Sequence, residues 1–200
     1  MAIDSLLPLK RALAKEVAAS QEGPLRTEPD RRIAAVALVF SPTEEGLSVC
    51  MIRRAEHPDD PWSGHMAFPG GRREVDDVDS LGTAIRETKE EIGVSLSREQ
   101  CLGALKPVFV PVSLGVGAMT IEAFVFGLDS PLSPTGNAEV AAVYQFPLPQ
   151  LLTSEGRGTF EYKHRGGTVT LDCLDLQECR IWGLSLRILD YLLEKLTAVD

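Results

Sequence analysis

One apolar run constrains the fold of this chain more than any other feature. Residues Ile33 to Phe40 read IAAVALVF, an almost unbroken apolar stretch of strand length. A short apolar run of this kind, with Ser41-Pro42 as a turn after it, predicts a buried strand. Leu47 to Arg53 returns as a second strand, so the two are expected to form a hairpin. We therefore expect a sheet at the centre of the fold.

Further strands and helices are expected on both sides of this hairpin in the chain. Apolar residues at intervals of three or four predict helices over Leu6 to Val17, about Ser80 to Ile92, and Gly183 to Leu196. Strands are expected around His65–Phe68, Leu105–Val110, Met119–Phe126 and Gly158–Tyr162, with a partly helical stretch from Glu139 to Leu152. Because strands and helices intermix, the expected fold class is α/β, with a mixed sheet and helices on both faces.

The expected domain division follows from one turn-rich segment. Gln21 to Arg31 contains Gly23, Pro24 and Pro29, which is typical of a surface linker. We expect residues 1–30 to form an N-terminal helix and linker, and residues 31–200 to form a single domain. A chain of 200 residues is long enough for one domain with a substantial core.

The charge and the terminal sequence narrow the class of protein. The formal net charge of −9 argues against general binding to nucleic acid or to an anionic membrane. No apolar run is long enough to span a bilayer, and Met1 to Ser20 has no signal-peptide pattern, so we expect a cytoplasmic protein. The four cysteines form no CxxC pair and are expected to be reduced. An acidic chain can bind a polyanion where bound cations or local arginines reverse the field.

The segment from Arg86 to Gly93, RETKEEIG, is the strongest candidate for a functional site. At 100° per residue, Glu87, Glu90 and Glu91 fall within roughly a 100° sector of one helix. A different sector, suited to packing on the sheet, holds Leu81, Ile85, Thr88 and Ile92. Neighbouring carboxylates repel, and a hard cation such as Mg²⁺ or Mn²⁺ removes that cost because it prefers oxygen ligands. Taken alone, the same pattern is also typical of an acidic helix face exposed to water.

A glycine pair stands upstream of this helix, in Phe68-Pro69-Gly70-Gly71-Arg72-Arg73. Glycines after a strand let the backbone approach a ligand closely and can leave carbonyl or amide groups pointing inward. An ordinary strand-ending turn has the same local pattern. Combined with the acidic loop from Glu74 to Asp79 and the glutamate helix, the pair favours a metal site in which Gly71 joins the three glutamates.

These residues resemble the signature of the Nudix hydrolases: a glycine, five residues, a glutamate, seven residues, then Arg-Glu-apolar-x-Glu-Glu-x-Gly-apolar. The second half fits Arg86, Glu87, Glu90, Glu91, Gly93 and Val94, with Thr88 in place of the usual aliphatic residue.

The first half of the signature departs from the pattern. Fourteen residues separate Gly71 from Arg86 where the signature has thirteen, and Val78 stands where the first glutamate belongs. One inserted loop residue explains both, with Asp77 or Glu74 as the nearest carboxylate substitute.

The resemblance extends to one branch of the family. Gly64-x₃-Phe68-Pro69-Gly70-Gly71 and Ile181-Trp182-Gly183-Leu184 look like the coenzyme A pyrophosphatase branch. That branch usually has a basic cluster before the first segment, whereas here Asp59 to Ser63 fills much of that place, with Arg53 and Arg54 further upstream. The resemblance implies a Nudix-type α/β/α sandwich with a mixed central sheet, spanning roughly Arg31 to Leu196.

The resemblance also implies a reaction and roles for residues. It is hydrolysis of a pyrophosphate bond in a nucleoside diphosphate-linked small molecule, with coenzyme A or its derivatives as a lead. Metal ions on Glu87, Glu90 and Glu91 would neutralise phosphate charge and acidify bound water. Glu90 and Glu91 are thus candidate catalytic residues, with Arg86 orienting one glutamate through a charge-assisted hydrogen bond.

The remaining candidates lie outside the signature. Glu139 is the candidate general base because it follows the Pro134-Thr135-Gly136-Asn137 loop, although a glutamate favoured at a helix N-terminus fits equally well. In this acidic chain, Arg53, Arg54, Arg72 and Arg73 are candidates for binding the substrate phosphates, although simple exposure at the surface explains each one better.

Two alternative functions stay open. One is a pyrophosphatase for nucleotide sugars, dinucleotides or nucleoside triphosphates. The other is a non-catalytic nucleotide-binding domain, although such domains typically lose one or more of the helix glutamates, all of which are present here. The expected partner is a small nucleotide rather than nucleic acid or a membrane, and assembly as a homodimer is left open.

Overall fold

The computed structural model describes residues 6–19, 32–58, 60, 62–111, 118–164 and 166–198. The predicted linker from Gln21 to Arg31, and with it the expected boundary at residue 30, lies outside the described residues. All four cysteines are unpaired, as expected.

A mixed eight-stranded sheet is built around β1 (Arg32–Thr43). This strand pairs antiparallel with β2 (Gly46–Arg54) and β4 (Gly70–Arg72), and parallel with β7 (Met119–Gly127). The outer strands are β3 (Met66–Ala67) and β8 (Val140–Pro147) on β2, and β5 (Cys101–Ala104) and β6 (Val108–Val110) on β7. The hairpin expected around the IAAVALVF run is confirmed.

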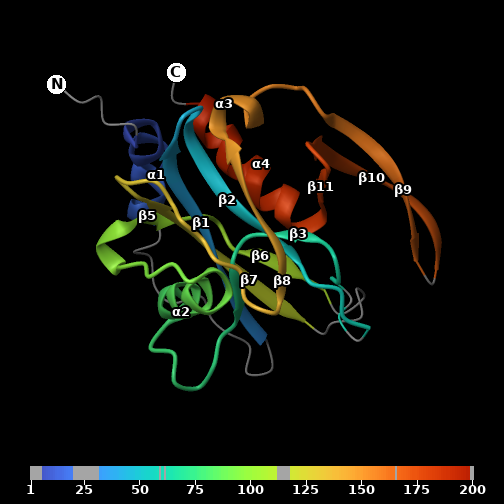
Figure 1. Cartoon of the computed structure of the whole chain (residues 1–200), viewed down its shortest axis with the longest axis horizontal. Coiled ribbons are helices and arrows are strands. Elements are labelled where there is room, and N and C mark those ends of the chain that lie inside the picture. The colour runs from blue at the N-terminus through green and yellow to red at the C-terminus, as the bar shows by residue number, and fades with distance from the viewer. Residues whose placement is uncertain are drawn as a thin grey trace.

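The two faces of β1 belong to two separate core clusters. Ala35, Ala37 and Val39 pack with apolar residues of α2 (Ser80–Ile92) on one face. Alternate residues, including Leu38 and Phe40, pack on the other face with α1 (Leu7–Ala19) and α4 (Gly183–Thr197). Helices α2 and α4 therefore lie on opposite sides of the sheet (Figure 1), which confirms the expected α/β class.

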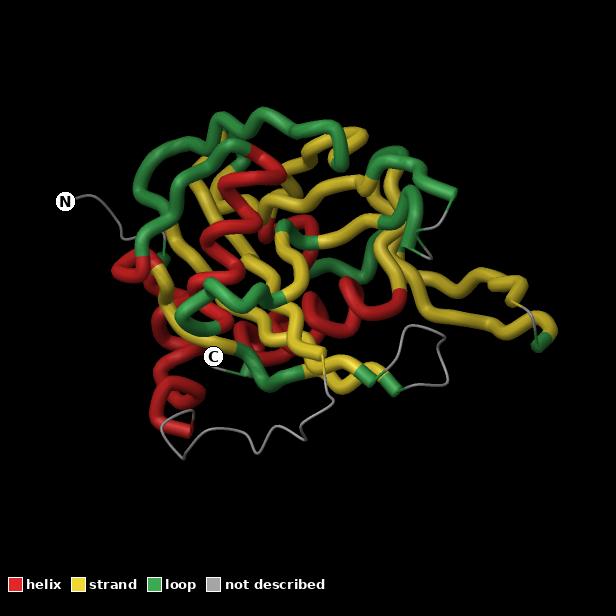
Figure 2. The backbone as a smooth tube through the Cα atoms, turned by 90° about the horizontal axis from the view of Figure 1, so that it is seen from below, coloured by secondary structure: helices red, strands yellow, loops and turns green. Residues whose placement is uncertain are grey.

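A second, three-stranded sheet extends from this body. It consists of β9 (Arg157–His164), β10 (Gly167–Leu176) and β11 (Cys179–Trp182), in the order β11-β10-β9. The β9–β10 hairpin projects away from the rest of the molecule (Figure 2). Two short helical segments complete the description, α3 (Leu148–Leu151) after β8 and η1 (Arg98–Gln100) before β5.

Two predicted elements are confirmed over only part of their expected length. The stretch from Glu139 to Leu152 is mostly strand β8, because pairing with β2 from Ser48 to Arg54 outweighs local helix preference, and helix is confined to Leu148–Leu151. The single strand expected around Leu105–Val110 is β6 alone, and β5 ends before it at Ala104. Strands β10 and β11 were not predicted, since β10 is largely exposed over its first half and lacks a buried apolar run.

Candidate active site

Helix α2 has the bounds that its sequence predicts. At its start, the Asp79 Oδ1 atom accepts the backbone N–H of Gly82 at 2.8 Å, so Asp79 is the N-cap. Arg98 donates to the same carboxylate at 2.7 Å and fixes the cap. At the other end Gly93 has a φ of 70°, and its N–H closes on the Lys89 carbonyl. The glutamates are thus carried by a helix defined at both ends.

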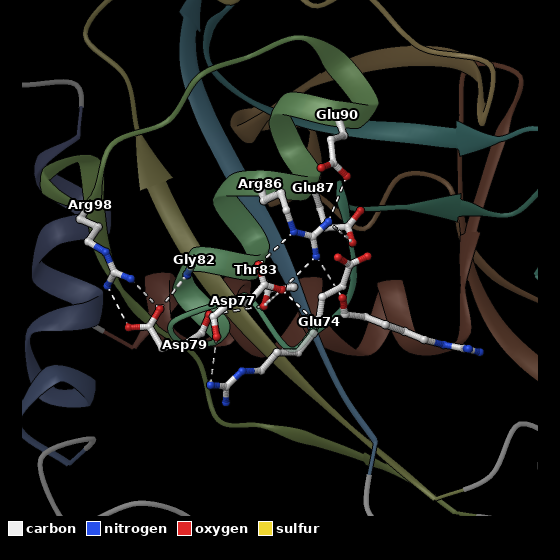
Figure 3. Close-up of polar contacts among 11 residues, drawn as sticks. Glu74, Asp77, Asp79, Gly82, Thr83, Arg86, Glu87, Glu90 and Arg98 are labelled. Carbon is white, nitrogen blue, oxygen red and sulfur yellow. Dashed lines mark hydrogen bonds and ion pairs between the residues drawn. The ribbon is translucent and has the colours of Figure 1, made fainter.

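The guanidinium of Arg86 is the centre of the site (Figure 3). Its Nε and Nη2 donate to the two oxygens of Asp77 at 2.9 and 3.0 Å, a bidentate pair. Its Nη1 donates to Glu87 Oε1 and to Glu90 Oε2, each at 3.0 Å. The Nη2 also donates to the Arg72 carbonyl at 3.2 Å. One side chain therefore joins the acidic loop, β4 and two of the helix glutamates.

The acidic loop directs Asp77, rather than Glu74, to this guanidinium. Asp77 Oδ2 also accepts the Glu74 N–H and the Thr83 hydroxyl, both at 2.9 Å. The hydrogen bonds from Arg86, supported by these donors, hold the pKa of Asp77 well below its usual range. Asp77 is therefore the carboxylate of the acidic loop that contacts Arg86.

Glu91 is buried between α2 and the glycine pair. The residue is 3% exposed, and its Oε2 atom accepts a hydrogen bond from the Gly70 N–H at 2.8 Å. Burial raises the pKa of Glu91 to about 7. A Cβ at the neighbouring Gly71 would overlap the Glu87 carboxylate, so this carboxylate lies directly against the backbone of β4. Strand β4 thus brings its backbone directly against two of the candidate metal ligands.

The three helix glutamates do not converge on one point in this structure. Glu91 turns to Gly70, whereas Glu87 and Glu90 turn to Arg86. Among the residues described, no three acidic, histidine or cysteine side chains are grouped closely enough to hold a metal ion.

The donor set nevertheless suits a hard cation. Arg86 contacts one oxygen each of Glu87 and Glu90, so the second oxygen of each lies outside those contacts. Burial raises the pKa of Glu87 as well as that of Glu91, and a cation nearby would favour both carboxylates. Carboxylate oxygens are the ligands that Mg²⁺ and Mn²⁺ prefer.

Strand alternation separates the predicted phosphate-binding arginines. Arg54 lies near Glu91, where its charge partly offsets the rise that burial causes in the Glu91 pKa. Its Nη2 is 2.7 Å from Asp60 Oδ2. Arg53 instead lies 5.8 Å from the ring of Tyr144, which packs against the core on the α1–α4 face. Arg72 contributes its carbonyl to Arg86, and its side chain is exposed. The structure therefore brings Arg54, but not Arg53, to the glutamates.

Arg73 has a structural contact in the acidic loop. Its Nη2 donates to the carbonyl oxygens of Val78 at 3.0 Å and Asp77 at 3.4 Å.

Glu139 lies close to the same carboxylates. Burial is the main cause of the raised pKa values of Glu87 and Glu91, and the charge of Glu139 raises both further. Glu139 is exposed and directly precedes β8, so its interpretation as a residue of a helix N-terminus is wrong.

Two residues around the site escaped the sequence interpretation. Asp60 was considered only as one of the residues that replace the basic cluster of the related branch, and it forms an ion pair with Arg54. Asn137, treated as loop, accepts the Glu139 N–H at 2.8 Å through Oδ1. The signal for Asn137 was its position two residues before the candidate base, where an asparagine side chain bonds to backbone.

Comparison with known proteins identifies the relatives of this architecture. The sequence model described as "NUDIX domain" matches residues 30–164. A mitochondrial coenzyme A diphosphatase of Homo sapiens, NUDT8, is 35% identical over 137 residues, covering 66% of this chain and 56% of that protein. The mitochondrial Nudix hydrolase 15 of Arabidopsis thaliana is 31% identical over 178 residues, covering 83% of this chain and 60% of that protein. The chain thus spans less than two thirds of the length of these relatives.

Solved structures agree on the fold. A MutT/nudix family protein from Enterococcus faecalis superposes with a TM-score of 0.60 at 19% identity, covering 96% of this chain and 73% of that one. A MutT NUDIX hydrolase from Burkholderia pseudomallei gives a TM-score of 0.54 at 16% identity, covering 81% of this chain and 98% of that one. These similarities confirm the expected sandwich. In the portion of the chain that is described, no helix is both long and apolar enough to cross a membrane.

Proposed function

The chain belongs to the NUDIX domain family, and from that premise we propose that it is a metal-dependent hydrolase of a pyrophosphate bond in a nucleoside diphosphate-linked substrate. One observation carries the proposal. Arg86 joins Asp77, Glu87 and Glu90 at 2.9 to 3.0 Å beside the buried Glu91. A preorganised group of carboxylates of this kind is costly to maintain for stability alone and suits the binding of cations.

The residues have distinct roles in this proposal. Glu87, Glu90 and Glu91, with the Gly71 backbone, would hold Mg²⁺ or Mn²⁺. The ion would supply neutralisation of phosphate charge and a more acidic bound water. Arg86 positions Glu87 and Glu90 through its hydrogen bonds. Arg54 binds a substrate phosphate, and Glu139 accepts the proton of the attacking water.

Coenzyme A or a derivative is the proposed substrate. The support is the 35% identity to a human protein named as a coenzyme A diphosphatase. The segments Gly64-x₃-Phe68-Pro69-Gly70-Gly71 and Ile181–Leu184 are consistent with that branch. The ion pair between Arg54 and Asp60 distinguishes this chain from a purely basic phosphate-binding surface.

The test is hydrolysis of a panel of substrates by the wild-type protein and two variants. The panel contains coenzyme A, ADP-ribose, NADH, a UDP-sugar, diadenosine polyphosphates and nucleoside triphosphates, with Mg²⁺, Mn²⁺ or a chelator. We expect metal-dependent cleavage of coenzyme A, and a fall in kcat of roughly 10²–10³ in Glu90→Gln, since it removes one preorganised charge. Glu194→Gln, an exposed glutamate of α4, is the matched control and should retain full activity.

Thermal melting of each variant separates loss of chemistry from loss of fold. If folded wild-type protein supplied with metal cleaves no member of the panel, the hydrolase proposal is wrong. Cleavage of a different member alone would reject coenzyme A and retain the reaction.

Two expectations about the cellular setting accompany the proposal. A cytoplasmic location stays a prediction, since the human and Arabidopsis relatives carry "mitochondrial" in their names. Assembly as a homodimer also stays a prediction, and light scattering of the purified chain measures it.

A further inference from the structure

One residue, Asn137, connects the proposed base Glu139 to helix α2 through hydrogen bonds. The Asn137 N–H donates to the Glu91 carbonyl at 2.9 Å, at the end of α2. The Asn137 Oδ1 atom accepts the Glu139 N–H at 2.8 Å. On its other side, the Glu139 carbonyl accepts the N–H of Ala55, which follows Arg54, at 2.8 Å. The Glu139 backbone is therefore held between α2 and the end of β2.

The strand that follows contains an irregularity at the same place. Arg53 pairs with Ala142, but Arg54 pairs with Val140, so Ala141 is an extra residue in β8. A bulge of this kind re-aims the side chains beside it and is common next to active sites. Because successive strand residues face opposite sides, a regular register would change which residues near Glu139 face α2. The bulge and Asn137 thus act on the same residue from its two sides.

We infer that Asn137 is a positioning residue that fixes Glu139 relative to Glu91 for the proposed hydrolysis. This inference rests on the proposed function. Asn137 acts through the backbone of Glu139, because its amide oxygen bonds to the Glu139 N–H. Its own backbone N–H donates to the Glu91 carbonyl at the end of α2, and alanine or serine at position 137 keeps this donor. The two roles of Asn137 can therefore be separated by substitution.

Three variants test the side chain. Asn137→Ala removes the acceptor, and Asn137→Ser restores a weaker one without adding charge. Asn137 has no positive φ, so neither change strains the backbone. Thr135→Ala is the matched control, since Thr135 also caps α2 through its backbone N–H, to the Ile92 carbonyl.

Steady-state kinetics on the best substrate of the panel gives the catalytic result. We expect Asn137→Ala to lower kcat by about 10- to 100-fold, with KM changed less than about twofold, because displacement of a reacting group costs that much. Asn137→Ser should recover part of the loss, and Thr135→Ala should match the wild type. In a Glu139→Gln background, Asn137→Ala should have little further effect. An unchanged kcat, or an equal loss in that background, overturns the inference.

Amide hydrogen exchange gives a result that does not depend on turnover. In Asn137→Ala, the Glu139 N–H should exchange at least about tenfold faster than in the wild type. In Thr135→Ala it should exchange at the wild-type rate. Equal rates in the wild type and Asn137→Ala overturn the inference even if both hydrolyse substrate. Absence of all hydrolysis refutes the proposed function, while the exchange data still decide whether Asn137 holds Glu139.

Discussion

The Arg86 guanidinium divides its donors between a loop carboxylate and two helix carboxylates. Its role in orienting a glutamate was predictable from the spacing of the signature. The choice between Asp77 and Glu74 was not, because it depends on a turn in which the Glu74 N–H bonds to Asp77. In contrast, the alternation of side chains along a strand was sufficient to predict that the adjacent Arg53 and Arg54 face opposite sides of the sheet.

Glu91 is predicted to make the metal-free protein less stable as the pH rises. Its pKa is raised from 4.5 to about 7 in the fold, so the folded state binds the proton more tightly. This contribution is complete below pH 4.5 and is lost as the pH rises through 7. The protonated Glu91 side chain thus contributes on the order of 3 kcal/mol to the free energy of unfolding at low pH. Asp77, whose pKa is lowered by Arg86, affects stability in a different pH range: its stabilising contribution is lost only as the pH falls below its ordinary pKa of 3.8.

Urea unfolding between pH 5 and pH 8 with a chelator present measures this effect. The Glu91→Gln variant, which has no titrating group there, should show a flatter dependence than the wild type. Added Mg²⁺ should offset the loss at pH 8, because a cation favours the carboxylate. Identical pH profiles for the two proteins would contradict the role given to Glu91.

At the scale of elements, the site depends on contact between β4 and α2. Local signals predicted the helix from Ser80 to Ile92 and a glycine pair after a strand, but not that the pair itself belongs to strand β4. Strand β8 was not predicted because its partner β2 lies far away in the chain and decides its conformation. Strand β10 pairs with the adjacent β9, but its exposed first half gives no buried apolar run to predict it from. The part of the site carried by one helix was therefore predictable, whereas the place of Glu139, in the turn before β8, had no local signal beyond its loop.

Gly71→Ala tests the contact between β4 and α2. Its new Cβ would overlap the Glu87 carboxylate, so β4 or Glu87 must move. Because the overlapped atoms are the far end of a flexible side chain, we expect a loss of stability of less than about 1 kcal/mol, together with a fall in kcat of about 10- to 100-fold from the displaced carboxylate. Gly158→Ala in β9 is the control, since a Cβ there has no neighbouring atom within 4 Å. Denaturation midpoints and kcat of both variants decide, and equal behaviour would show that β4 tolerates the added atom.

At the scale of the whole molecule, two apolar clusters hold the sheet between its helices. Helix α1 takes part in one of them through Leu9 and Leu13, together with Leu6 just before it, and it packs against β5 and α4. The helix itself was predicted from its periodicity. Its place in the core was not, because the sequence shows an apolar stripe without its partner.

Leu13→Ala should destabilise the whole protein if α1 is part of one cooperative core. Leu13 is 0% exposed, so truncation should cost about 2–5 kcal/mol in the free energy of unfolding. Leu7→Ala, at a position 41% exposed on the same helix, should cost less than about 0.5 kcal/mol. Urea unfolding of each variant measures both values. A small effect of Leu13→Ala, or a separate early transition, would instead support α1 as an independent segment.

The acidic loop has a consequence for how this chain can be altered or labelled. Val75 is fully exposed, at 102%, and Val78 is 84% exposed, while Asp77 between them anchors the loop to Arg86. Two hydrogen bonds between Glu74 and Asp77 close the turn that holds Val75, so added length between these residues would disturb the anchor. The exposed side chain of Val75 is accordingly the position for a fluorescent reporter attached through a cysteine substitution, because such a change keeps the length of the turn and its backbone bonds.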